Sequence, residues 1–551
     1  MSNFIYAIGL LGVVLSIFLL ASVPPVSRDA LTHHLYIPKL YIQHGGIYEI
    51  PALKFSYYPM NIDLLYMIPL YFKNDIAPKF IHFAFALATG FLMYQYLSRR
   101  IHQAYALLGS LLFLSLPVII RLSSTVYVDL GLVFFLFASQ LYIYRWIESG
   151  FRIKYLIISA VFCGLGLGTK YNGLIGLFLL SLFIPFVYSR YHPSNESYGG
   201  RSIFYGAVFT LIALLVFSPW MIRNVFWTGN PVYPLYNRVF NSAETESVGK
   251  MSETVIEKRS QMSHIEIRRQ IYGESWWDIA LIPIRVFFGG RDDSPAHFDG
   301  KTNPFLLLLP IFALFGIRNR SKQVKTEIML MFFFSTLFFL FAFVQHHIRI
   351  RYFAPILPTL VVLAIFGLDN LNKTLHRQEW RLSKGIVTSI FIAIVAVMLG
   401  LNAQYLISRF KRDQPLGYIT EKVSRDEYIQ LYRPDYAVFQ YANRHLTADS
   451  KILGLYMGGR GYYSDIDISF DLKILQQFAA KSKSPADILR KLQNRHFTHL
   501  LVNYNLFNYW VQRYDLNERI MLKEFFDKCV AKEFSKEGFG LLRLISPEKR
   551  S

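Results

Sequence analysis

Cysteines and acidic residues are both scarce in this chain, and each shortage excludes a class of protein. The sequence holds 37 Asp and Glu against 58 Lys and Arg, and only 17% of its 551 residues are charged. Its two cysteines, Cys163 in an apolar segment and Cys529 near the end, cannot build a disulfide framework or a metal knuckle. Internal repeats and low-complexity tracts are absent as well. The composition therefore excludes a disulfide scaffold, a zinc-knuckle protein and a repeat array.

Hydrophobic residues are abundant instead. They make up 53% of the chain, 17% is aromatic, and the formal net charge is +21. This profile is typical of a polytopic membrane protein. In a soluble protein the positive charge would suggest nucleic acid, but here the bases fall mostly in short loops between apolar runs, where topology and anionic lipids account for them. No recognition motif accompanies the charge, so we expect membrane lipids and not nucleic acid as partners.

Apolar runs along the chain predict 11 membrane spans. The first run lacks a basic leader and is followed by Pro24-Pro25, so we expect a retained helix and not a cleaved signal peptide. A further apolar run at 60–72 contains Pro69 and has only about three turns, so we predict a short helix in the first loop that does not cross. The predicted spans are 4–23, 77–97, 104–120, 125–145, 154–169, 172–189, 203–221, 302–317, 325–344, 352–368 and 385–406.

Bases in the short loops predict the orientation of the chain. With a cytoplasmic amino terminus, every basic short loop falls on the cytoplasmic side, as expected for a multi-pass protein of the inner membrane. The opposite side receives the first loop 24–76, the long loop 222–301 and the carboxyl-terminal tail. The bases that decide this orientation are Arg99, Arg100, Arg145, Arg152, Lys154, Arg190, Arg201, Arg318, Arg320, Lys322, Lys325, Arg377, Arg381 and Lys384.

The tail differs from the rest of the chain. Residues 1–406 read as a transmembrane domain, whereas 407–551 mix charged and apolar residues. A helix is expected at 485–493, with Ser484 as its cap. Together with short β-like runs this alternation predicts a small extracytoplasmic α/β domain. The β-like runs are 452–457, 499–503 and 539–544.

Ionisable and polar residues gather where spans meet the outer side. Charged groups are costly to hold at a membrane boundary, so they usually mark a site or a headgroup anchor. Because these groups share the depth of the outer lipid headgroups, an anionic lipid phosphate lies within reach of their bases, and arginine suits phosphate through bidentate contacts. The groups are residues 27–39, which include Asp29, then 123–129, 168–172, and 220–224 with 345–352.

The order and sidedness of these pieces resemble the GT-C superfamily of integral membrane glycosyltransferases, in particular the branch with protein O-mannosyltransferases and the lipid A aminoarabinose transferase. The most distinctive piece is Ser218-Pro219-Trp220-Met221-Ile222-Arg223-Asn224, followed by 229–234. The other matching pieces are Arg28-Asp29 with His33-His34, Tyr57-Tyr58-Pro59, Tyr127-Val128-Asp129, the turn 164–173, and 351–358. The resemblance implies a polytopic, all-α GT-C bundle that carries the extracytoplasmic domain.

The resemblance also implies an activity: a sugar is moved from a polyprenyl-phosphate donor to a glycolipid, polysaccharide or protein acceptor outside the cytoplasm, with inversion. We expect Asp29 to take the acceptor proton and Asp129 to bind sugar hydroxyls or orient the acceptor, which makes these two the catalytic candidates. Cations must face the leaving phosphate. The predicted substrate-binding residues are His33, His34, Tyr58, Tyr127, Lys170, Tyr171, Arg223, Asn224, His346, Arg349 and Arg351.

We expect no cofactor to be required. Other GT-C members carry an acidic pair beside the first aspartate, whereas Arg28-Asp29-Ala30 supplies one acid, which disfavours a divalent metal. The histidine pairs at 33–34 and 346–347 are open to metal binding or to simple packing. The acidic pair Asp292-Asp293 resembles that of nucleotide-sugar enzymes but is a weak signal on its own.

Structural roles stay open for the same residues. Asp29 could be the first-turn acid of a helix capped by Ser27, and Asp129 the first-turn acid behind Ser123 or Ser124. Lys170 could extend to the interface from its loop, Arg223 could pack under Trp220, and Arg349 with Arg351 could anchor headgroups. Three other functions remain as alternatives: a transporter, a ligase of O-antigen type with a diphosphate carrier, and an assembly factor that docks through its tail.

Overall fold

The computed structural model describes residues 2–192, 197–241, 262–315, 317–344, 348–375 and 383–546. The chain divides into two compact units. The first, here called the helical unit, consists of Met1–Ser22, Tyr57–Leu65 and Ile76–Pro415. The second, the mixed unit, consists of Val23–Ser56, Tyr66–Asp75 and Leu416–Ser551.

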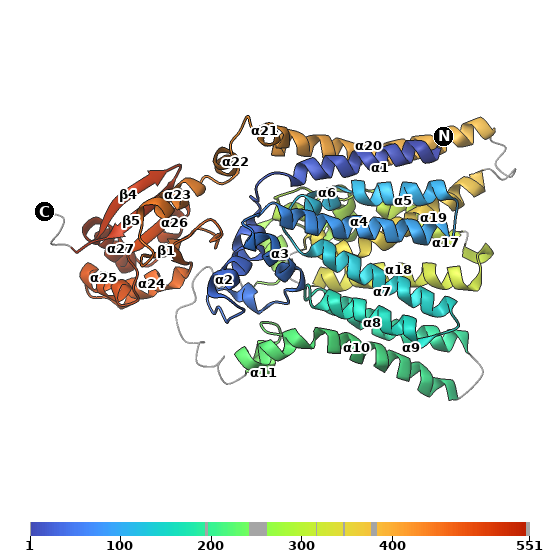
Figure 1. The fold of residues 1–551 in the computed structure, drawn as a ribbon, viewed down its shortest axis with the longest axis horizontal. Helices are drawn as coiled ribbons and strands as arrows, with labels where there is room; N and C mark the ends of the chain where they lie inside the picture. Colours follow the sequence, from blue (N-terminus) through green and yellow to red (C-terminus); the bar gives the residue numbers. More distant parts are fainter. Residues whose placement is uncertain are drawn as a thin grey trace. The chain divides into compact units, whose positions relative to one another are not determined.

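The helical unit is a bundle of long apolar helices that run side by side (Figure 1). Among the described residues, 8 helices are long and apolar enough to span a membrane, or 9 if the bent pair α5 and α6 forms one span. Every predicted span coincides with one of these helices or with the shorter α8 and α17, so the chain is a multi-pass membrane protein, as predicted. The bundle consists of α1 (Ser2–Ala21), α4 (Ala77–Ser98), α5 (Gln103–Ser115), α6 (Pro117–Ser123), α7 (Asp129–Glu148), α8 (Ile153–Leu167), α9 (Gly173–Tyr191), α10 (Ser197–Thr228), α17 (Phe305–Phe315), α18 (Lys322–Val344), α19 (Leu357–Leu375) and α20 (Lys384–Asp413).

The span predicted as one helix at 104–120 is broken. Its two parts, α5 and α6, meet at a bend of 63°. Pro117 begins α6, and the preceding Leu116 has extended backbone angles (φ −56°, ψ 133°) because the proline ring disfavours a helical residue before it. The bend brings Arg121 and the loop after Ser123 to the end of the bundle where α7 begins. Therefore α7 begins at Asp129, and not at the predicted residue 125.

Short elements connect the bundle helices. Helix α3 (Asn61–Tyr71) has 11 residues and a proline at position 69. At 1.5 Å per residue it is about 16 Å long, and unlike α8 and α17 it is not among the apolar helices found in the described residues, which favours the prediction of a non-crossing helix. The remaining connecting elements of the helical unit are α11 (Asn237–Phe240), α14 (His264–Glu266), η3 (Ile267–Ile271), α15 (Trp276–Ala280), α16 (Ile282–Phe288), η4 (Pro295–His297), η5 (Ile317–Asn319) and η6 (Ile350–Ile356).

The mixed unit is built around a five-stranded sheet of order β2-β1-β3-β5-β4. Strand β1 is parallel to β2 and β3, whereas β5 is antiparallel to β3 and β4. The strands are β1 (Lys451–Leu455), β2 (Asp467–Ser469), β3 (His499–Asn503), β4 (Val530–Lys536) and β5 (Phe539–Leu544). The three predicted β-like runs correspond to β1, β3 and β5, while β2 and β4 were not predicted.

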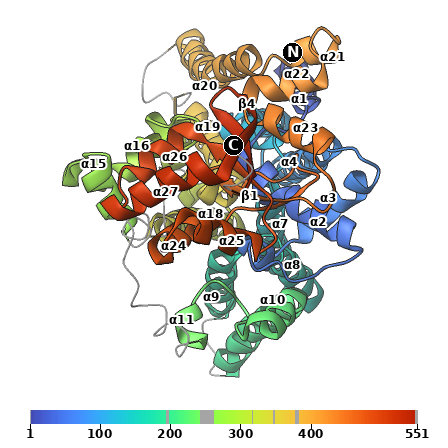
Figure 2. The ribbon, with the colours of Figure 1, turned by 90° about the vertical axis from the view of Figure 1, so that its left-hand side faces the viewer.

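Helices cover both faces of this sheet (Figure 2). Residues Leu453 and Leu500 pack with α24, α25 and α27, whereas Ile452 and Leu501 pack with α23 on the opposite face. The alternation follows from the period of two in a strand. The helices and turns of the mixed unit are η1 (Ala30–His34), α2 (Tyr36–His44), η2 (Lys54–Tyr57), α21 (Pro415–Ile419), α22 (Arg425–Tyr432), α23 (Tyr436–His445), α24 (Leu472–Lys481), α25 (Pro485–Gln493), α26 (Tyr504–Val511) and α27 (Leu516–Cys529).

The boundary between the two compact units differs from the boundary predicted after residue 406. Position 406 lies inside α20, which continues to Asp413 because its last turns are amphipathic and end with Lys411 and Arg412, bases that suit the negative end of a helix. Most of the first loop, which the sequence assigned to the transmembrane domain, packs with the tail in the mixed unit.

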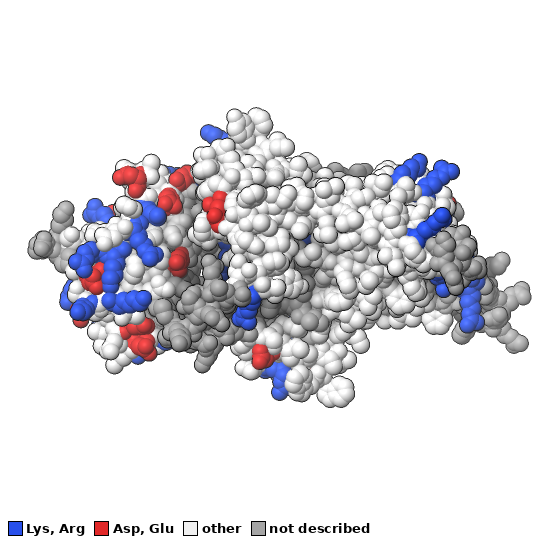
Figure 3. Space-filling view, turned by 90° about the horizontal axis from the view of Figure 1, so that it is seen from below, with Lys and Arg blue, Asp and Glu red and all other residues white. Residues whose placement is uncertain are grey.

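Charge is distributed unevenly on the helical unit. Figure 3 shows a flank nearly free of charged side chains, with Lys and Arg gathered at the end where α4 finishes and α10 begins. This end, here called the basic end, carries Arg145 in the last turn of α7 and Arg99, Arg100 and Arg152 in short loops. The opposite end carries the loops before α7, after α8 and after α10.

The contact between α17 and α19 depends on a glycine. A Cβ atom on Gly367 would lie 2.0 Å from the carbonyl oxygen of Leu309. We therefore expect Gly367→Ala to destabilise the detergent-solubilised protein by about 1–3 kcal/mol, which a lower thermal unfolding midpoint would report. Gly400→Ala on α20 is the matched control, since nothing lies within 4 Å of its Cβ position. Equal midpoints for the two variants would contradict the close packing.

Candidate functional site

A buried ion pair joins the start of α7 to the turn after α8. The Nζ atom of Lys170 lies 2.6 Å from Oδ1 of Asp129, and the two side chains are 20% and 3% exposed. The second carboxylate oxygen of Asp129 is buried and has no hydrogen-bond partner among the described residues. A buried carboxylate is costly unless a cation accompanies it, so Lys170 is what permits Asp129 to lie here ionised.

His82 on α4 fixes the backbone beside Asp129. Its Nε2 atom accepts a hydrogen bond from the Leu130 amide at 2.9 Å, so Nδ1 carries the ring proton and donates to the carbonyls of Leu122 (2.9 Å) and Thr125 (3.1 Å). The imidazole is fully buried. Sequence analysis missed this residue, although a histidine inside an otherwise apolar span was a usable signal.

Aromatic rings and a second base surround the ion pair. The guanidinium of Arg351 lies 4.9 Å from the ring of Tyr127, and Nζ of Lys170 lies 5.2 Å from the ring of Tyr352. Such contacts hold a cation in place through the electron-rich ring face. We call Tyr127, Asp129, Lys170, Arg351 and Tyr352 the Asp129 cluster.

A second cluster forms at the end of α10 around Arg223. Its guanidinium lies 4.6 Å from the ring of Trp220 and 4.7 Å from that of Trp227. The Nη2 atom donates to the carbonyl of Tyr58 at 3.1 Å and to Oδ1 of Asn224 at 2.9 Å. The spacing of these side chains on one helix face follows from the turn of 3.6 residues. Two indole rings and two neutral acceptors thus hold one cation.

Asn224 links this arginine to the turn after α8. It is fully buried, and its amide nitrogen donates to the Tyr57 carbonyl at 2.9 Å and to the Tyr171 hydroxyl at 3.1 Å. Tyr171 in turn donates to the Tyr233 carbonyl at 2.9 Å, and its ring lies 5.2 Å from that of Tyr58. We call Tyr58, Tyr171, Trp220, Arg223, Asn224 and Trp227 the Arg223 cluster.

Asn61 secures the loop beneath both clusters. Its backbone amide donates to the Gly168 carbonyl at 2.8 Å, and its side chain accepts from the Trp220 indole at 2.8 Å. A Cβ atom on Gly168 would lie 2.1 Å from the side-chain amide nitrogen of Asn61, so only glycine allows this close approach. Because Lys170 and Tyr171 are neighbours in the same turn, it couples the Asp129 cluster to the Arg223 cluster. Asn61 was also missed by sequence analysis.

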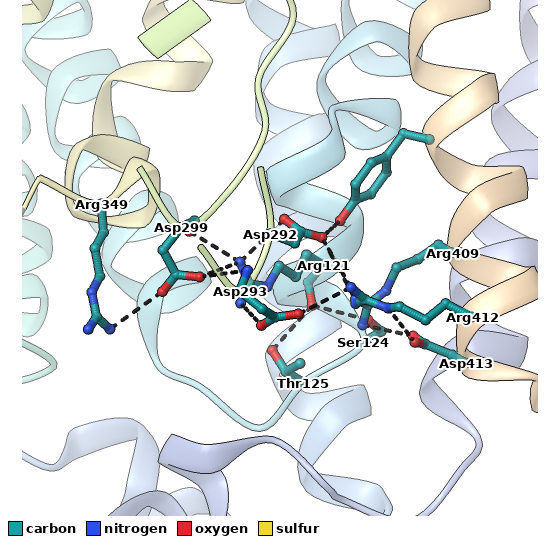
Figure 4. A network of polar contacts seen from close by, with 11 residues as sticks. Arg121, Ser124, Thr125, Asp292, Asp293, Asp299, Arg349, Arg409, Arg412 and Asp413 are labelled. Atoms are coloured by element: carbon teal, nitrogen blue, oxygen red, sulfur yellow. Dashed lines mark hydrogen bonds and ion pairs between the residues drawn. The ribbon is translucent and has the colours of Figure 1, made fainter. Parts of the chain in front are cut away.

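A network of arginines and acids lies between α6, the long loop and α20 (Figure 4). Arg121 bonds Asp293 at 2.9 Å and Asp299 at 3.0 Å, and it contacts Asp292 at 3.3 Å. Arg349, predicted to bind substrate, is paired with Asp299 at 3.5 Å. The other members are Ser124, Thr125, Tyr405, Arg409, Arg412 and Asp413.

Arginines of the network lower the pKa of one of its acids, Asp299. Burial raises the pKa of Asp299, but the nearby guanidinium groups of Arg121 and Arg349 outweigh it and hold that pKa below its usual range. Asp292 and Asp293 likewise contact guanidinium groups, an environment that favours a structural role over binding of a nucleotide sugar.

The predicted base lies in the mixed unit. Asp29 directly precedes the π-helical turn η1 and adds no side-chain hydrogen bond to its capping. The Leu31 amide donates to the backbone carbonyl of Ser27 and not to its hydroxyl. His33 stacks on Phe55 with ring centroids 4.2 Å apart, and His34 is 8% exposed. π-Helical turns are rare and often occur at functional sites. The position of η1 directly after Asp29 therefore favours a functional role for this loop.

The tail holds this first loop in place. Nζ of Lys39 donates to the carbonyls of Tyr462 (2.9 Å) and Ser464 (2.7 Å) and to Asp465 (2.9 Å). The Tyr462 amide donates to the Leu31 carbonyl at 3.2 Å, within the segment that carries Asp29. Because these contacts join residues more than 400 positions apart, no local pattern predicted them.

The structure thus places the predicted residues that it describes in four sets. Asp129, Tyr127, Lys170 and Arg351 meet in one cluster, and Tyr58, Tyr171, Arg223 and Asn224 in the adjoining one. Asp29, His33 and His34 belong to the mixed unit, and Arg349 joins the arginine network. His346 lies outside the described residues. In the described part of the chain, no group of three or more His, Cys, Asp or Glu side chains is arranged to hold a metal ion.

The chain is similar to known proteins in part of its sequence and in its fold. Residues 66–222 match the family model described as dolichyl-phosphate-mannose-protein mannosyltransferase. The structure superposes on ArnT from Cupriavidus metallidurans bound to undecaprenyl phosphate, with a TM-score of 0.56, 13% identity, and coverage of 98% of this chain and 97% of that one. It also superposes on the Archaeoglobus fulgidus oligosaccharyltransferase, with a TM-score of 0.54, 11% identity, and coverage of 96% and 74%. No protein of curated function matches the sequence.

These likenesses define the fold of the protein. The chain has the fold of the GT-C integral membrane glycosyltransferases, as its motifs predicted. Its segment 66–222 is similar in sequence to the dolichyl-phosphate-mannose-protein mannosyltransferases. The matched segment includes Asp129, Lys170 and Tyr171.

Hydrogen exchange tests whether the contacts of Lys39 hold the first loop against the tail. Lys39→Met removes three hydrogen bonds from the Tyr462–Asp465 segment. We expect the Tyr462 amide to exchange at least about tenfold faster, because each charged hydrogen bond stabilises by about 1.5–3 kcal/mol. Lys54→Met is the matched control, since Lys54 is exposed in the same loop. Unchanged exchange in Lys39→Met would show that the loop is held by other contacts.

Proposed function

We propose that the protein is a glycosyltransferase that moves a sugar from a polyprenyl-phosphate carrier to an acceptor outside the cytoplasm, with inversion at the anomeric carbon. The observation that carries this proposal is the gathering of Lys170, Arg223 and Arg351 in two adjoining clusters at one end of the helical unit. The family match points to dolichyl-phosphate mannose as a donor type, and related folds were solved with undecaprenyl phosphate and dolichol-phosphate.

The cations are suited to the leaving group. As the bond between the anomeric carbon and the phosphate oxygen breaks, the electron pair goes to the phosphate, whose charge increases. Donors already oriented toward that charge stabilise the transition state without reorganising. Arg223 is oriented by two indole rings, and Lys170 by Asp129 and the ring of Tyr352. We assign both, with Arg351, to binding of the lipid phosphate.

Asp129 is assigned to the sugar. Its Oδ1 atom holds Lys170, while its buried Oδ2 atom has no hydrogen-bond partner in the described part of the chain. A buried carboxylate oxygen of this kind is a strong acceptor for a sugar hydroxyl. In this role Asp129 connects the ring of the donor to the cation that faces its phosphate.

Asp29 is proposed as the base, on the sequence argument. The acceptor hydroxyl oxygen attacks the anomeric carbon from the face opposite the phosphate, its proton passes to the Asp29 carboxylate, and polyprenyl phosphate departs. One displacement inverts the anomeric configuration. No divalent metal enters this scheme, so transfer should persist in EDTA.

The basic end of the helical unit is proposed to face the cytoplasm. Short loops rich in Lys and Arg favour that side, and the amino terminus and the short loops after α4 and α7 would lie there. The Asp129 and Arg223 clusters, at the other end, would then face the periplasm or its equivalent. This orientation gives the enzyme access to carriers presented on the outer leaflet of the inner membrane.

A transfer assay tests the function. The purified protein is reconstituted with a panel of sugars on either polyprenyl phosphate or polyprenyl diphosphate, together with membranes of the source cells as acceptors. We expect release of polyprenyl phosphate and labelling of an acceptor from a monophosphate donor only. Transfer from diphosphate donors alone would favour a ligase, and solute uptake into vesicles without transfer would favour a transporter.

Asp29→Asn tests the base. Loss of the proton acceptor should lower the turnover number by about 10²-fold or more, while donor binding is retained. The matched control is Asp467→Asn, since Asp467 lies exposed on β2 of the same unit. Normal turnover in a folded Asp29→Asn protein would exclude Asp29 as the base, but it would not contradict the proposed binding of the lipid phosphate by Lys170, Arg223 and Arg351.

Arg223→Gln tests the phosphate site. The neutral side chain keeps hydrogen-bonding capacity but loses the charge, so we expect kcat/KM for the donor to fall about 10²-fold or more. Arg269→Gln is the matched control, because Arg269 also stacks on an indole, 4.4 Å from the ring of Trp276, but lies exposed outside both clusters. Equal losses in the two variants would indicate that Arg223 only packs the protein.

A further inference from the structure

A separate cavity of about 320 Å³ lies at the basic end, between α4 and α7. Its volume falls in the range of about 300–1,000 Å³ typical of small-ligand sites. Asp129 begins α7, whereas Arg145 and Glu148, which line the cavity, lie in its last turn. At 1.5 Å per residue the cavity is therefore about 25 Å from the Asp129 cluster. It belongs to a different part of the helical unit.

Positive charge dominates the walls of this cavity. Arg99, Arg100 and Arg145 line it with one acid, Glu148. Arg100 is engaged by Glu148 and, at 2.8 Å, by the buried Glu327. Arg145 approaches Glu148 only at 3.7 Å, and its side chain is 45% exposed. Arg99 is exposed and has no ion pair among the described residues. Two guanidinium groups thus retain donors for an anion.

A buried hydroxyl in the same wall lacks a partner. Tyr144 lines the cavity and is 2% exposed, yet its hydroxyl has no hydrogen-bond partner in the described part of the chain. Tyr96 beside it does have one, since it donates to Glu327 at 2.6 Å. Buried polar atoms are almost always satisfied, so an unsatisfied one in a cavity wall points to a ligand that supplies an acceptor.

We propose that this cavity binds the phosphate headgroup of an anionic lipid. Phosphate oxygens would accept from Arg99 and Arg145 in bidentate fashion and from the Tyr144 hydroxyl. Leu92 and Leu141 line the same cavity, and Phe91 next to Leu92 is 59% exposed on α4. These apolar side chains offer a path for an acyl chain along the flank of the bundle, which a free phosphate ion would not use.

Ligand-induced stabilisation of the full-length protein in a neutral detergent tests this proposal. Short-chain phosphatidylglycerol is titrated while the thermal unfolding midpoint is recorded, with short-chain phosphatidylcholine and inorganic phosphate in parallel. We expect a saturable rise for phosphatidylglycerol and a much smaller one for the other two. An equal rise for inorganic phosphate would identify a free anion as the ligand and overturn the lipid assignment. Absence of a saturable rise would overturn the site.

Variants locate the binding. The double variant Arg99→Ala, Arg145→Ala should weaken the apparent affinity for phosphatidylglycerol at least about tenfold, since it removes two charged donors. Tyr144→Phe should weaken it less, and Arg152→Ala, an exposed base at the same end, should leave it unchanged. Lys170→Gln should also leave it unchanged, which separates this cavity from the proposed transfer site. If the double variant does not fold, the single Arg145→Gln replaces it. Equal affinities of that variant and Arg152→Ala would contradict the proposal.

Discussion

The ion pair between Asp129 and Lys170 is the interaction on which the rest of the candidate site depends. It ties the first residue of α7 to the turn between α8 and α9, and both groups are largely removed from solvent. Removing one partner of a buried pair typically costs about 3–5 kcal/mol, because the other charge is left buried. The same turn presents Tyr171 to Asn224, so the pair also sets the position of the Arg223 cluster.

Two groups of arginines in the helical unit are used differently. Arg121, Arg409 and Arg412 face the acids Asp292, Asp293, Asp299 and Asp413, and the resulting network joins the long loop to α6 and α20. Arg223 lies against two indole rings and donates to the Tyr58 carbonyl, and Arg351 lies against a phenol ring. The arginines paired with acids stabilise the fold, and those that lie against aromatic rings are the ones proposed to bind the lipid phosphate.

Much of the fold could be predicted from local pattern. The helix at Pro485–Gln493 has clear start signals, and its Ser484 cap accepts from Asp487 as expected. Strands β3 and β5 lie inside the sheet and are apolar, so their sequences predicted strands. Strands β2 and β4 form the two edges of the sheet, and their charged residues interrupt the apolar pattern. The bend at Pro117 and the continuation of α20 to Asp413 were not foreseen, because hydropathy reports neither.

The candidate site was only partly predictable. Asp129, Lys170, Arg223 and Asn224 could be selected since each lies in a short motif at a helix end. His82 could have been selected as a histidine in an apolar span, but its role and that of Asn61 could not be predicted, because both depend on groups supplied by distant segments. The ion pair of Arg349 could not be predicted for the same reason: its partner Asp299 comes from the long loop, which is distant from it in the sequence. Contacts between segments that are far apart in the chain cannot be predicted from a single sequence.

A structure of the protein with polyprenyl phosphate tests the central claim most directly. The account predicts that the phosphate lies at the end of the bundle where α7 begins, in contact with Lys170 and with at least one of Arg223 and Arg351. A phosphate bound elsewhere, with the Asp129 and Arg223 clusters unoccupied and unchanged, would contradict it.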